Sequence, residues 1–284
     1  MGRTAEIVKD IAEVVKNYPP SLMNSVLDKK LFDNVKTYVM FLGYSRSGHS
    51  LIGALLDAHP DIVIAHELDT LKYITARYRK RQIYNLLLKN SQSFARNGQR
   101  TKHFSYEVPN QWQGKFNTIQ VIGDKQGEGS TLRLQARPGL LGSLQKIIDD
   151  DKKLIHVARN PYDNISTISK KTKRHGRSLN LRESVDYYFS LCKTVADTKS
   201  RIESSRFYEL RHESFIDDPK TILNDLCIFV GVSATDDYLS DCAGIVYKSP
   251  NKSRRKSPWN QELIDLVRDR MKEFPFLKGY SYED

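Results

Sequence analysis

The chain has 284 residues, of which 39% are hydrophobic and 28% are charged. This length and composition fit one folded domain with a sizeable core, and they exclude a globally disordered chain. No apolar run approaches the roughly 18 residues that a membrane span requires, and the N-terminus lacks the apolar stretch of a secretory signal. We therefore expect one domain over residues 1–284, a helical extension over 1–34, no membrane association and a cytoplasmic location.

The formal net charge of +11 favours partners that carry negative charge, such as nucleic acids, nucleotides or acidic substrates. A basic segment with an interleaved tyrosine, residues 77–81 (RYRKR), would suit a nucleic-acid surface. The three cysteines, Cys192, Cys227 and Cys242, have neither the spacing of a disulfide framework nor that of a metal site. We expect free thiols and no bound metal.

Short apolar segments rich in β-branched residues alternate along the chain with segments of helical periodicity. The segments with strand character are residues 37–43, 62–65, 118–123, 154–158 and 206–211. The segments with helical character are residues 51–58, 181–198 and 219–230. This alternation predicts an α/β fold of three layers, in which helices flank a central parallel sheet. Two polar and basic stretches, 73–114 and 249–258, are predicted to be variable segments.

A glycine-rich loop, residues 43–50 (GYSRSGHS), joins the first predicted strand to the first predicted helix. Its spacing is that of the nucleotide-triphosphate loop, but His49 stands where that loop has its lysine. Backbone amides and the helix dipole can still converge on an anion there, and the planar cation of Arg46 can clamp an oxygen. A tight packing turn without a ligand is the simpler alternative, and a P-loop kinase or NTPase is another.

A second candidate anion site follows the fourth predicted strand. That strand, residues 154–158, leads into Arg159, then Asn-Pro and the start of a helix. An arginine at the carboxyl end of a strand, beside a helix N-terminus, is well placed to bind a phosphate. The alternative is a surface arginine that pairs with Asp163.

Residues 43–67 resemble the 5′-phosphosulfate loop of sulfotransferases that use 3′-phosphoadenosine-5′-phosphosulfate (PAPS), and they are most similar to the tyrosylprotein and bacterial branch. The matching residues are Arg46, Ser47, Gly48, Ser50, Leu51 and the segment 56–60. The resemblance implies a P-loop-like fold and donor contacts from the loop residues Ser45, Arg46, Ser47, Gly48, His49 and Ser50. Two positions depart from the family pattern: Ser45 replaces a proline, and His49 replaces a hydroxyl residue.

The same family resemblance extends to the second site. It implies that Arg159 and Thr167, eight residues later, hold the 3′-phosphate of the donor, with Ser166 as the neighbouring alternative. It also implies that the segments 73–114 and 249–258 cover the substrate and the nucleotide, with Lys252, Arg254 and Arg255 over the nucleotide. Two phosphate sites about a hundred residues apart suit an adenosine that carries phosphate at both its 3′ and 5′ ends, and ATP lacks that arrangement.

Glu67 is the predicted general base. It lies seven residues after Pro60, where the resembled tyrosylprotein branch has its catalytic glutamate. A carboxylate beside a buried cleft can have its pKa raised toward neutrality. His66 is the alternative base, because cytosolic sulfotransferases use a histidine. Adjacent residues of a strand point to opposite faces, so we expect only one of the two to face the site.

Three other side chains complete the catalytic set that the resemblance implies. Lys125 would neutralise the bridging oxygen as it leaves, Ser249 would contact the sulfuryl region, and Arg46 would clamp its oxygens. Asp124 is superficially similar to the magnesium-binding aspartate of ATPases, but an apolar strand often ends in aspartate. His212 replaces the tyrosine of a Tyr-Glu pair that many relatives have after the fifth strand.

These features predict a sulfotransferase that transfers the sulfuryl group from PAPS to a hydroxyl acceptor and releases 3′-phosphoadenosine-5′-phosphate (PAP), without a metal. The acceptor would be a carbohydrate, a tyrosine or a small-molecule natural product, and the basic surface favours an acidic one. The alternatives are a P-loop nucleotide kinase or NTPase and a basic nucleic-acid-binding protein; nucleic acid is not an expected partner of the sulfotransferase.

Overall fold

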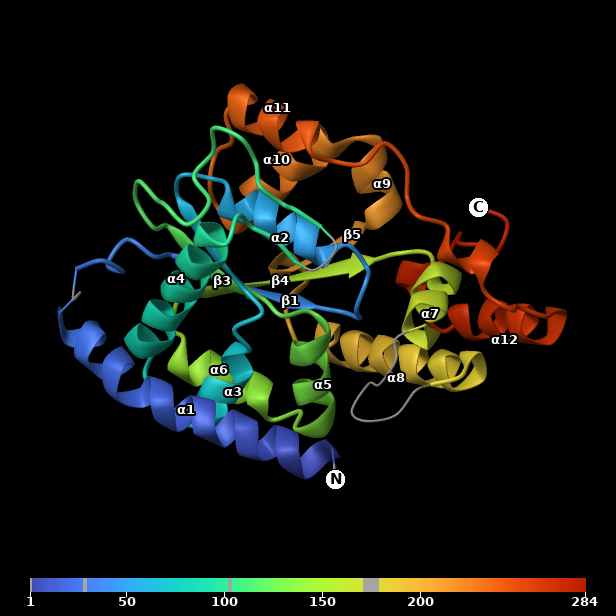
Figure 1. Cartoon of the computed structure of the whole chain (residues 1–284), viewed down its shortest axis with the longest axis horizontal. Coiled ribbons are helices and arrows are strands. Elements are labelled where there is room, and N and C mark those ends of the chain that lie inside the picture. Colours follow the sequence, from blue (N-terminus) through green and yellow to red (C-terminus); the bar gives the residue numbers. More distant parts are fainter. Residues whose placement is uncertain (1, 28–29, 102–103, 171–178) are drawn as a thin grey trace.

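The computed structural model describes residues 2–27, 30–101, 104–170 and 179–284. Its centre is a five-stranded sheet in the order β2-β3-β1-β4-β5, in which every neighbouring pair is parallel. The strands are β1 (Thr37–Leu42), β2 (Ile62–His66), β3 (Val121–Lys125), β4 (Asp151–Ala158) and β5 (Phe207–Arg211). Figure 1 shows helices on both sides of this sheet, so the predicted three-layer α/β fold is confirmed.

Twelve α-helices are found among the described residues. They are α1 (Gly2–Leu27), α2 (His49–Asp57), α3 (Thr70–Thr75), α4 (Lys80–Arg96), α5 (Glu128–Ala136), α6 (Leu140–Ile147), α7 (Pro161–Ser169), α8 (Leu181–Lys199), α9 (His212–Asp217), α10 (Pro219–Val230), α11 (Asp236–Gly244) and α12 (Gln261–Met271). Helices α2 and α9–α11 lie on one side of the sheet, and α1, α3, α5, α6 and α8 lie on the other (Figure 1). No helix of the described residues is long and apolar enough to cross a membrane.

The central strand β1 explains the two layers of core. Its residues are all buried, because helices cover the sheet on both faces. Tyr38 and Met40 point into the core beneath α3, α4 and α6, whereas Val39 and Phe41 point into the core beneath α2 and α10. This alternation is the period of two that a strand imposes on its side chains.

The order of the strands also fixes where a ligand can bind. From β1 the chain crosses to β2 on one side, and from β4 it continues to β5 on the other side. The connections that follow the neighbouring strands β1 and β4 therefore leave in opposite directions, and in open α/β sheets ligands bind at the carboxyl ends of the strands at such a point.

Helix α4 was not predicted, because its part of the segment 73–114 has no clear apolar period. Several polar residues lie on its buried face together with Ile83 and Leu87. The Gln82 amide donates to Ser21, and the Asn85 amide donates to the carbonyl of Arg81. Burial of hydrogen-bonded polar residues hides the helical period that a sequence pattern relies on.

Gly123 marks the closest approach between the central strands. It lies in β3 opposite Val39 of β1 and Ile64 of β2. A Cβ at this position would come within 2.5 Å of the Val39 carbonyl oxygen, which is a backbone atom that cannot move aside. The sheet can therefore close here only around glycine.

We predict that Gly123→Ala lowers the free energy of unfolding by about 1–3 kcal/mol, because the new methyl group overpacks the sheet. Urea unfolding followed by circular dichroism measures the change. The control is Gly142→Ala in α6, where a Cβ meets nothing within 4 Å. That change should be neutral or stabilise the protein by up to about 1 kcal/mol. Equal stabilities of the two variants would contradict this account of the sheet.

Candidate functional site

The glycine-rich loop after β1 turns the chain into the N-terminus of α2. Gly48 has a φ of 100°, and Arg46 also has a positive φ, of 66°. A Cβ on Gly48 would lie 2.3 Å from Nδ1 of His212, so the imidazole of α9 packs directly on the glycine backbone. The loop therefore needs glycine at position 48 both for its conformation and for this contact.

His49 occupies the position that lysine takes in the nucleotide-triphosphate loop. Its ring is 5% exposed, and its Nδ1 lies 3.0 Å from Oγ of Ser47. On the other side of the ring lies Gly127, where a Cβ would come within 2.8 Å of the imidazole. The ring is held between these two contacts and lines a cavity together with Ser50.

Arg159, at the end of β4, reaches across to this loop. Its Nη1 donates to the carbonyl of Arg46 at 2.9 Å, and its Nη2 donates to the carbonyl of Asn251. Burial lowers the pKa of Arg159, and its Nε has no hydrogen-bond partner among the described residues. The guanidinium thus joins the loop after β1 to the segment 249–258. The alternative that it pairs with Asp163 is wrong, since that carboxylate bonds to Arg254.

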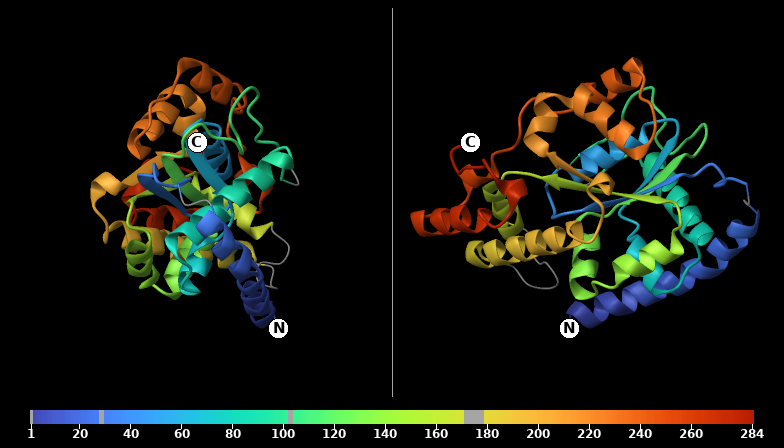
Figure 2. Two further views of the ribbon diagram at one scale, coloured as in Figure 1. Left: turned by 90° about the vertical axis from the view of Figure 1, so that its left-hand side faces the viewer. Right: turned by 180° about the vertical axis from the view of Figure 1, so that it is seen from behind.

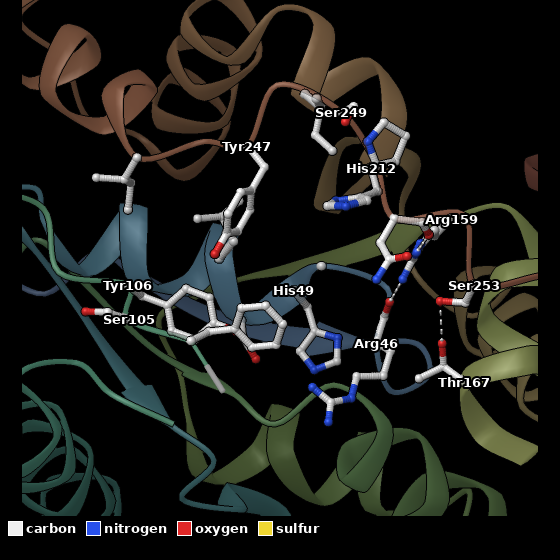
Figure 3. Close-up of a pocket in the computed structure, with 18 residues that line it drawn as sticks. Arg46, His49, Ser105, Tyr106, Arg159, Thr167, His212, Tyr247, Ser249 and Ser253 are labelled. Atoms are coloured by element: carbon white, nitrogen blue, oxygen red, sulfur yellow. Dashed lines mark hydrogen bonds between the residues drawn. The ribbon is translucent and has the colours of Figure 1, made fainter. Parts of the chain in front are cut away.

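One cavity of about 550 Å³ contains both candidate anion sites. Its volume lies within the roughly 300–1,000 Å³ that is typical of sites for small ligands. Figure 3 shows Tyr106 and Tyr247 at one end, Arg159, Ser253 and Thr167 at the other, and Arg46, His49 and His212 between them. The cavity therefore has an aromatic end and a cationic end.

The cationic end contains hydroxyl groups as well as the arginine. Thr167 lies in the last turn of α7, and its Oγ1 donates to the Asp163 carbonyl and lies 3.3 Å from Oγ of Ser253. Ser249 also lines the cavity. His212 adds a buried Nδ1 that has no partner among the described residues, and burial followed by the charge of Arg159 lowers its pKa to about 4.

The aromatic end was missed by the sequence analysis. Phe104 and Tyr106 come from the segment 73–114, and Tyr247 follows α11. The rings of Phe104 and Tyr106 stack with centroids 6.1 Å apart, and Tyr247 meets Phe104 edge-on at 6.5 Å. Nothing in the local pattern marks these aromatics, because they meet only through the fold.

A buried lysine connects the cavity to the candidate base. Lys125 is 1% exposed, and its Nζ donates to Oγ of Ser50 at 3.0 Å and to Oε1 of Glu67 at 2.9 Å. Nε2 of His66 lies 3.5 Å from the same ammonium group. Gly53 makes room for the lysine stem, since a Cβ there would lie 2.6 Å from its Cγ.

The expectation that His66 and Glu67 face opposite sides is wrong. Strand β2 ends at His66, and Glu67 has a φ of 60°, so the period of two ends with the strand. Both side chains therefore turn toward Lys125. The imidazole also stacks on Phe94 with centroids 3.8 Å apart.

The expected rise in the pKa of Glu67 is also wrong. Burial raises this pKa, but the charge and hydrogen bond of Lys125 outweigh that effect and lower it below its ordinary value. The side chain is 52% exposed, which limits the effect of burial. Burial and Lys125 lower the pKa of His66 to about 4, and burial lowers the pKa of Lys125.

Asp124 stabilises the turn after β2 through hydrogen bonds to its backbone. Its two carboxylate oxygens accept from the backbone amides of Leu68 and Thr70, at 3.1 and 2.7 Å. Burial raises its pKa to about 6. These bonds hold the turn that contains Glu67. Within the ranges that the structure describes, no group of three or more potential ligands could hold a metal ion.

Several predicted nucleotide contacts have side chains outside the lining of the cavity. They are Ser45, Ser47, Ser166, Lys252, Arg254 and Arg255. The carbonyl of Ser45 accepts from Asn164 at 2.7 Å, and the buried hydroxyl of Ser166 accepts from the indole of Trp259 at 2.9 Å. Lys252 donates to the carbonyl of Asp284. The hydrogen bonds of Ser45, Ser166 and Lys252 connect segments that form the walls of the cavity, whereas Arg255 is exposed.

Arg254 forms the most buried ion pair of the site. Its Nη1 lies 2.5 Å from Oδ2 of Asp163, and its backbone amide donates to Oδ1 at 2.9 Å. The two side chains are 3% and 2% exposed. The pair fastens the segment 249–258 to α7, and therefore places Asn251 and Ser253 against the cationic end.

The basic segment 77–81 does not form an exposed stripe. Tyr78 is 1% exposed and its hydroxyl donates to the carbonyl of Val14 at 2.6 Å. Lys80 pairs with Asp149 and Asp150, and Arg81 pairs with Asp33. A buried tyrosine has no ring face to offer to a base.

The comparisons with known proteins identify the family and the fold. The model of the sulfotransferase family matches residues 39–237, which is more than half of the chain, so the chain belongs to the sulfotransferase family. Sulfotransferase STF9 from Mycobacterium avium has a similar fold, with a TM-score of 0.51 at 13% identity over 94% of this chain and 81% of that chain. The sulfotransferase from Alicyclobacillus acidocaldarius gives 0.47 at 15% identity over 84% and 93%. No curated protein sequence matches the chain.

We predict that Arg254→Met lowers the free energy of unfolding by about 3–5 kcal/mol, because it leaves the Asp163 carboxylate buried without its partner. Guanidinium unfolding measures the loss. Adding Asp163→Asn should recover part of it, since the uncompensated charge is removed. An unchanged stability of the single variant would show that Arg254 does not hold the segment in place.

Proposed function

We propose that this sulfotransferase uses PAPS as donor and transfers its sulfuryl group to a hydroxyl acceptor. The observation that supports this most is that Arg46 and Arg159 line one cavity, although they are more than a hundred residues apart in the sequence. A cavity with two cationic sites suits a nucleotide with phosphate at both ends. A place in the tyrosylprotein or bacterial branch remains a prediction.

The residues of the cavity fit the parts of this donor. The loop amides, Arg46 and Ser50 would hold the 5′-phosphosulfate at the N-terminus of α2. Arg159 and Thr167 would hold the 3′-phosphate at the cationic end. The unpartnered Nε of Arg159 and Nδ1 of His212 mark polar atoms that a ligand would satisfy.

The aromatic end and the basic segment each bear on the choice of ligand. Tyr106 and Tyr247 offer ring faces to an adenine base. A P-loop kinase or NTPase is disfavoured because His49 replaces the lysine that reaches the terminal phosphates of ATP. A nucleic-acid surface is disfavoured because Tyr78 is buried.

PAPS supplies an activated sulfuryl group whose sulfur–oxygen bond to the 5′-phosphate breaks as the acceptor oxygen bonds to sulfur. Glu67, which its lowered pKa keeps ionised, would take the acceptor proton. Lys125, hydrogen-bonded to both Ser50 and Glu67, would balance negative charge at the inner end of the loop. The proposal needs no metal, and the acceptor would be a carbohydrate, a tyrosine or a small molecule, with an acidic one favoured by the net charge.

We predict that 3′,5′-adenosine diphosphate raises the melting temperature of the wild-type protein, whereas ATP with magnesium and an oligonucleotide do not, because binding to the folded state alone stabilises it. Arg46→Ala and Arg159→Ala should lose most of the shift. Arg201→Ala, which alters an exposed arginine just after α8 that does not line the cavity, is the matched control and should keep it. A shift with ATP alone would contradict the proposal.

We predict that Glu67→Gln keeps the nucleotide shift but lowers the rate of sulfuryl transfer by roughly 10²–10⁴-fold, because the proton acceptor is lost. Glu262→Gln, an exposed glutamate of α12, is the control. Full turnover of Glu67→Gln together with inactivity of His66→Gln would assign the base to His66.

The pH dependence of sulfuryl transfer should reflect the lowered pKa values of Glu67 and Lys125. Because the pKa of Glu67 is lowered, its carboxylate stays ionised until the pH falls below 4.5, the ordinary pKa of a glutamate. The loss of activity on the acid side should appear only below that pH. The pKa of Lys125 is also lowered. As the pH rises, Lys125 should therefore lose its charge, and the enzyme its activity, before the pH reaches the ordinary lysine value of 10.5. An acid limb near neutrality that vanishes in Glu67→Gln would contradict the lowered pKa of Glu67.

A further inference from the structure

Most amphipathic helices turn their apolar side toward the protein core. Helix α1 instead has a row of apolar side chains on the side that faces away from the protein. Six apolar side chains lie along that side and are 37% to 65% exposed: Ile7, Ile11, Val15, Tyr18, Leu22 and Val26. We call them the apolar stripe. Their spacing of four, four, three, four and four residues keeps them on one helical face. The neighbouring Val8 and Met23 are exposed as well, at 61% and 60%.

The polar side of α1 holds the helix to the body of the protein. Asp10 pairs with Arg133 at 2.6 Å, and Glu13 pairs with the buried Lys72 at 2.9 Å. Asn17 donates to the hydroxyl of Tyr73 at 2.9 Å. Ser21 is 1% exposed and accepts from Gln82. These contacts fix the rotation of the helix, so the apolar stripe is exposed along its outer side, while the ring of Tyr18 also meets Tyr78 edge-on with centroids 5.3 Å apart.

The size of the apolar stripe is that of an interface. It exposes on the order of 600 Å² per chain, close to the roughly 800 Å² that each partner contributes to a stable complex. No charged residue lies within it. Contiguous apolar surface of this extent usually marks an interaction site.

The spacing of the residues in the apolar stripe indicates that its partner is a second copy of this chain. The spacing is the same when counted from either end, with its midpoint between Lys16 and Asn17. An antiparallel copy of the same helix, related by a two-fold axis at that midpoint, would place stripe residues opposite one another as the pairs Ile7 with Val26, Ile11 with Leu22, and Val15 with Tyr18. A two-fold contact requires such a self-complementary surface.

A lipid surface fits the same helix less well. Helices that lie on membranes use Lys and Arg on their polar side to bind anionic headgroups. Here Asp10, Glu13 and Asn17 are all engaged with the body of the protein, and the exposed lysines among the described side chains of α1 are two, Lys9 and Lys16. We propose that the chain forms a two-fold dimer in which the apolar stripes of two α1 helices pack antiparallel.

The dimer would leave the functional cavity open. Helix α1 runs along the outside of the molecule beneath α3 and α6, on the other side of the sheet from α9–α11 (Figures 1 and 2). Dimerisation and nucleotide binding are therefore separate properties, and either can fail without the other.

Sedimentation of the full chain over a range of micromolar concentrations tests the proposal. The wild type should be a dimer. Ile11→Glu combined with Val15→Glu should weaken association at least 100-fold, because the charges would be buried against apolar side chains. Ile228→Glu on α10, which alters a 63% exposed isoleucine elsewhere, should leave the dimer intact. A monomeric wild type, or a dimer that survives the stripe variant, overturns the proposal, provided that thermal unfolding shows all variants folded.

Cross-linking tests the antiparallel arrangement, since Cys192, Cys227 and Cys242 are buried. Ile7→Cys with Val26→Cys should give a covalent dimer on oxidation, because the two positions meet across the axis. Ile7→Cys alone should not, because the two copies of position 7 would lie about 29 Å apart along the helices. Efficient cross-linking of the single variant overturns the arrangement. A monomer that sediments with phosphatidylcholine and phosphatidylserine vesicles overturns the dimer in favour of a membrane.

Discussion

The shape of the site depends on the contacts of one buried guanidinium. Arg159 donates to the carbonyls of Arg46 and Asn251, which belong to segments far apart in the sequence. These contacts bring the glycine-rich loop and the segment 249–258 to the same arginine, and they turn two carbonyl dipoles toward its charge. The Arg254–Asp163 pair holds the second segment from behind. The two candidate anion sites therefore belong to one cavity, with Arg46 and Arg159 in its lining.

The turn between β2 and α3 combines backbone strain with buried charge. Glu67 and Asp69 both have a positive φ, of 60° and 68°, which costs free energy for residues other than glycine. Asp124 accepts from the amides on either side of Asp69, and Arg133 binds the Asp69 carboxylate with its Nε 2.6 Å from Oδ1. The turn is held in this form, and it directs Glu67 back toward Lys125. Because Lys125 is buried, its ammonium group depends on this carboxylate for compensation.

The sequence predicted the features that arise from local patterns. The alternation of apolar strands and helices predicted the parallel sheet, and the predicted strand and helix on either side of the glycine-rich loop are β1 and α2. The place of Arg159 at the end of a strand led to the second site, because parallel strands end at one edge of their sheet. In each case a period or an element boundary determines where the residue lies.

The features that were missed arise from tertiary contacts. The burial of Gln82 and Asn85 hid α4, and the aromatic end assembles from Tyr106 and Tyr247, which are distant in sequence. Arg254 belongs to a basic run that suggested contact with phosphate, but the charge of Asp163 draws it into the wall. The positive φ of Glu67 ended the strand pattern that had separated it from His66.

The central claim is that a single nucleotide bridges the glycine-rich loop and Arg159. Calorimetric titration with 3′,5′-adenosine diphosphate, 5′-AMP and 3′-AMP, against the wild type, Arg46→Ala and Arg159→Ala, tests it most directly. The account predicts that the diphosphate binds most tightly, that Arg46→Ala weakens it and 5′-AMP but spares 3′-AMP, and that Arg159→Ala weakens it and 3′-AMP but spares 5′-AMP. Equal loss of both monophosphates in each variant, or a diphosphate no tighter than either monophosphate, would contradict it.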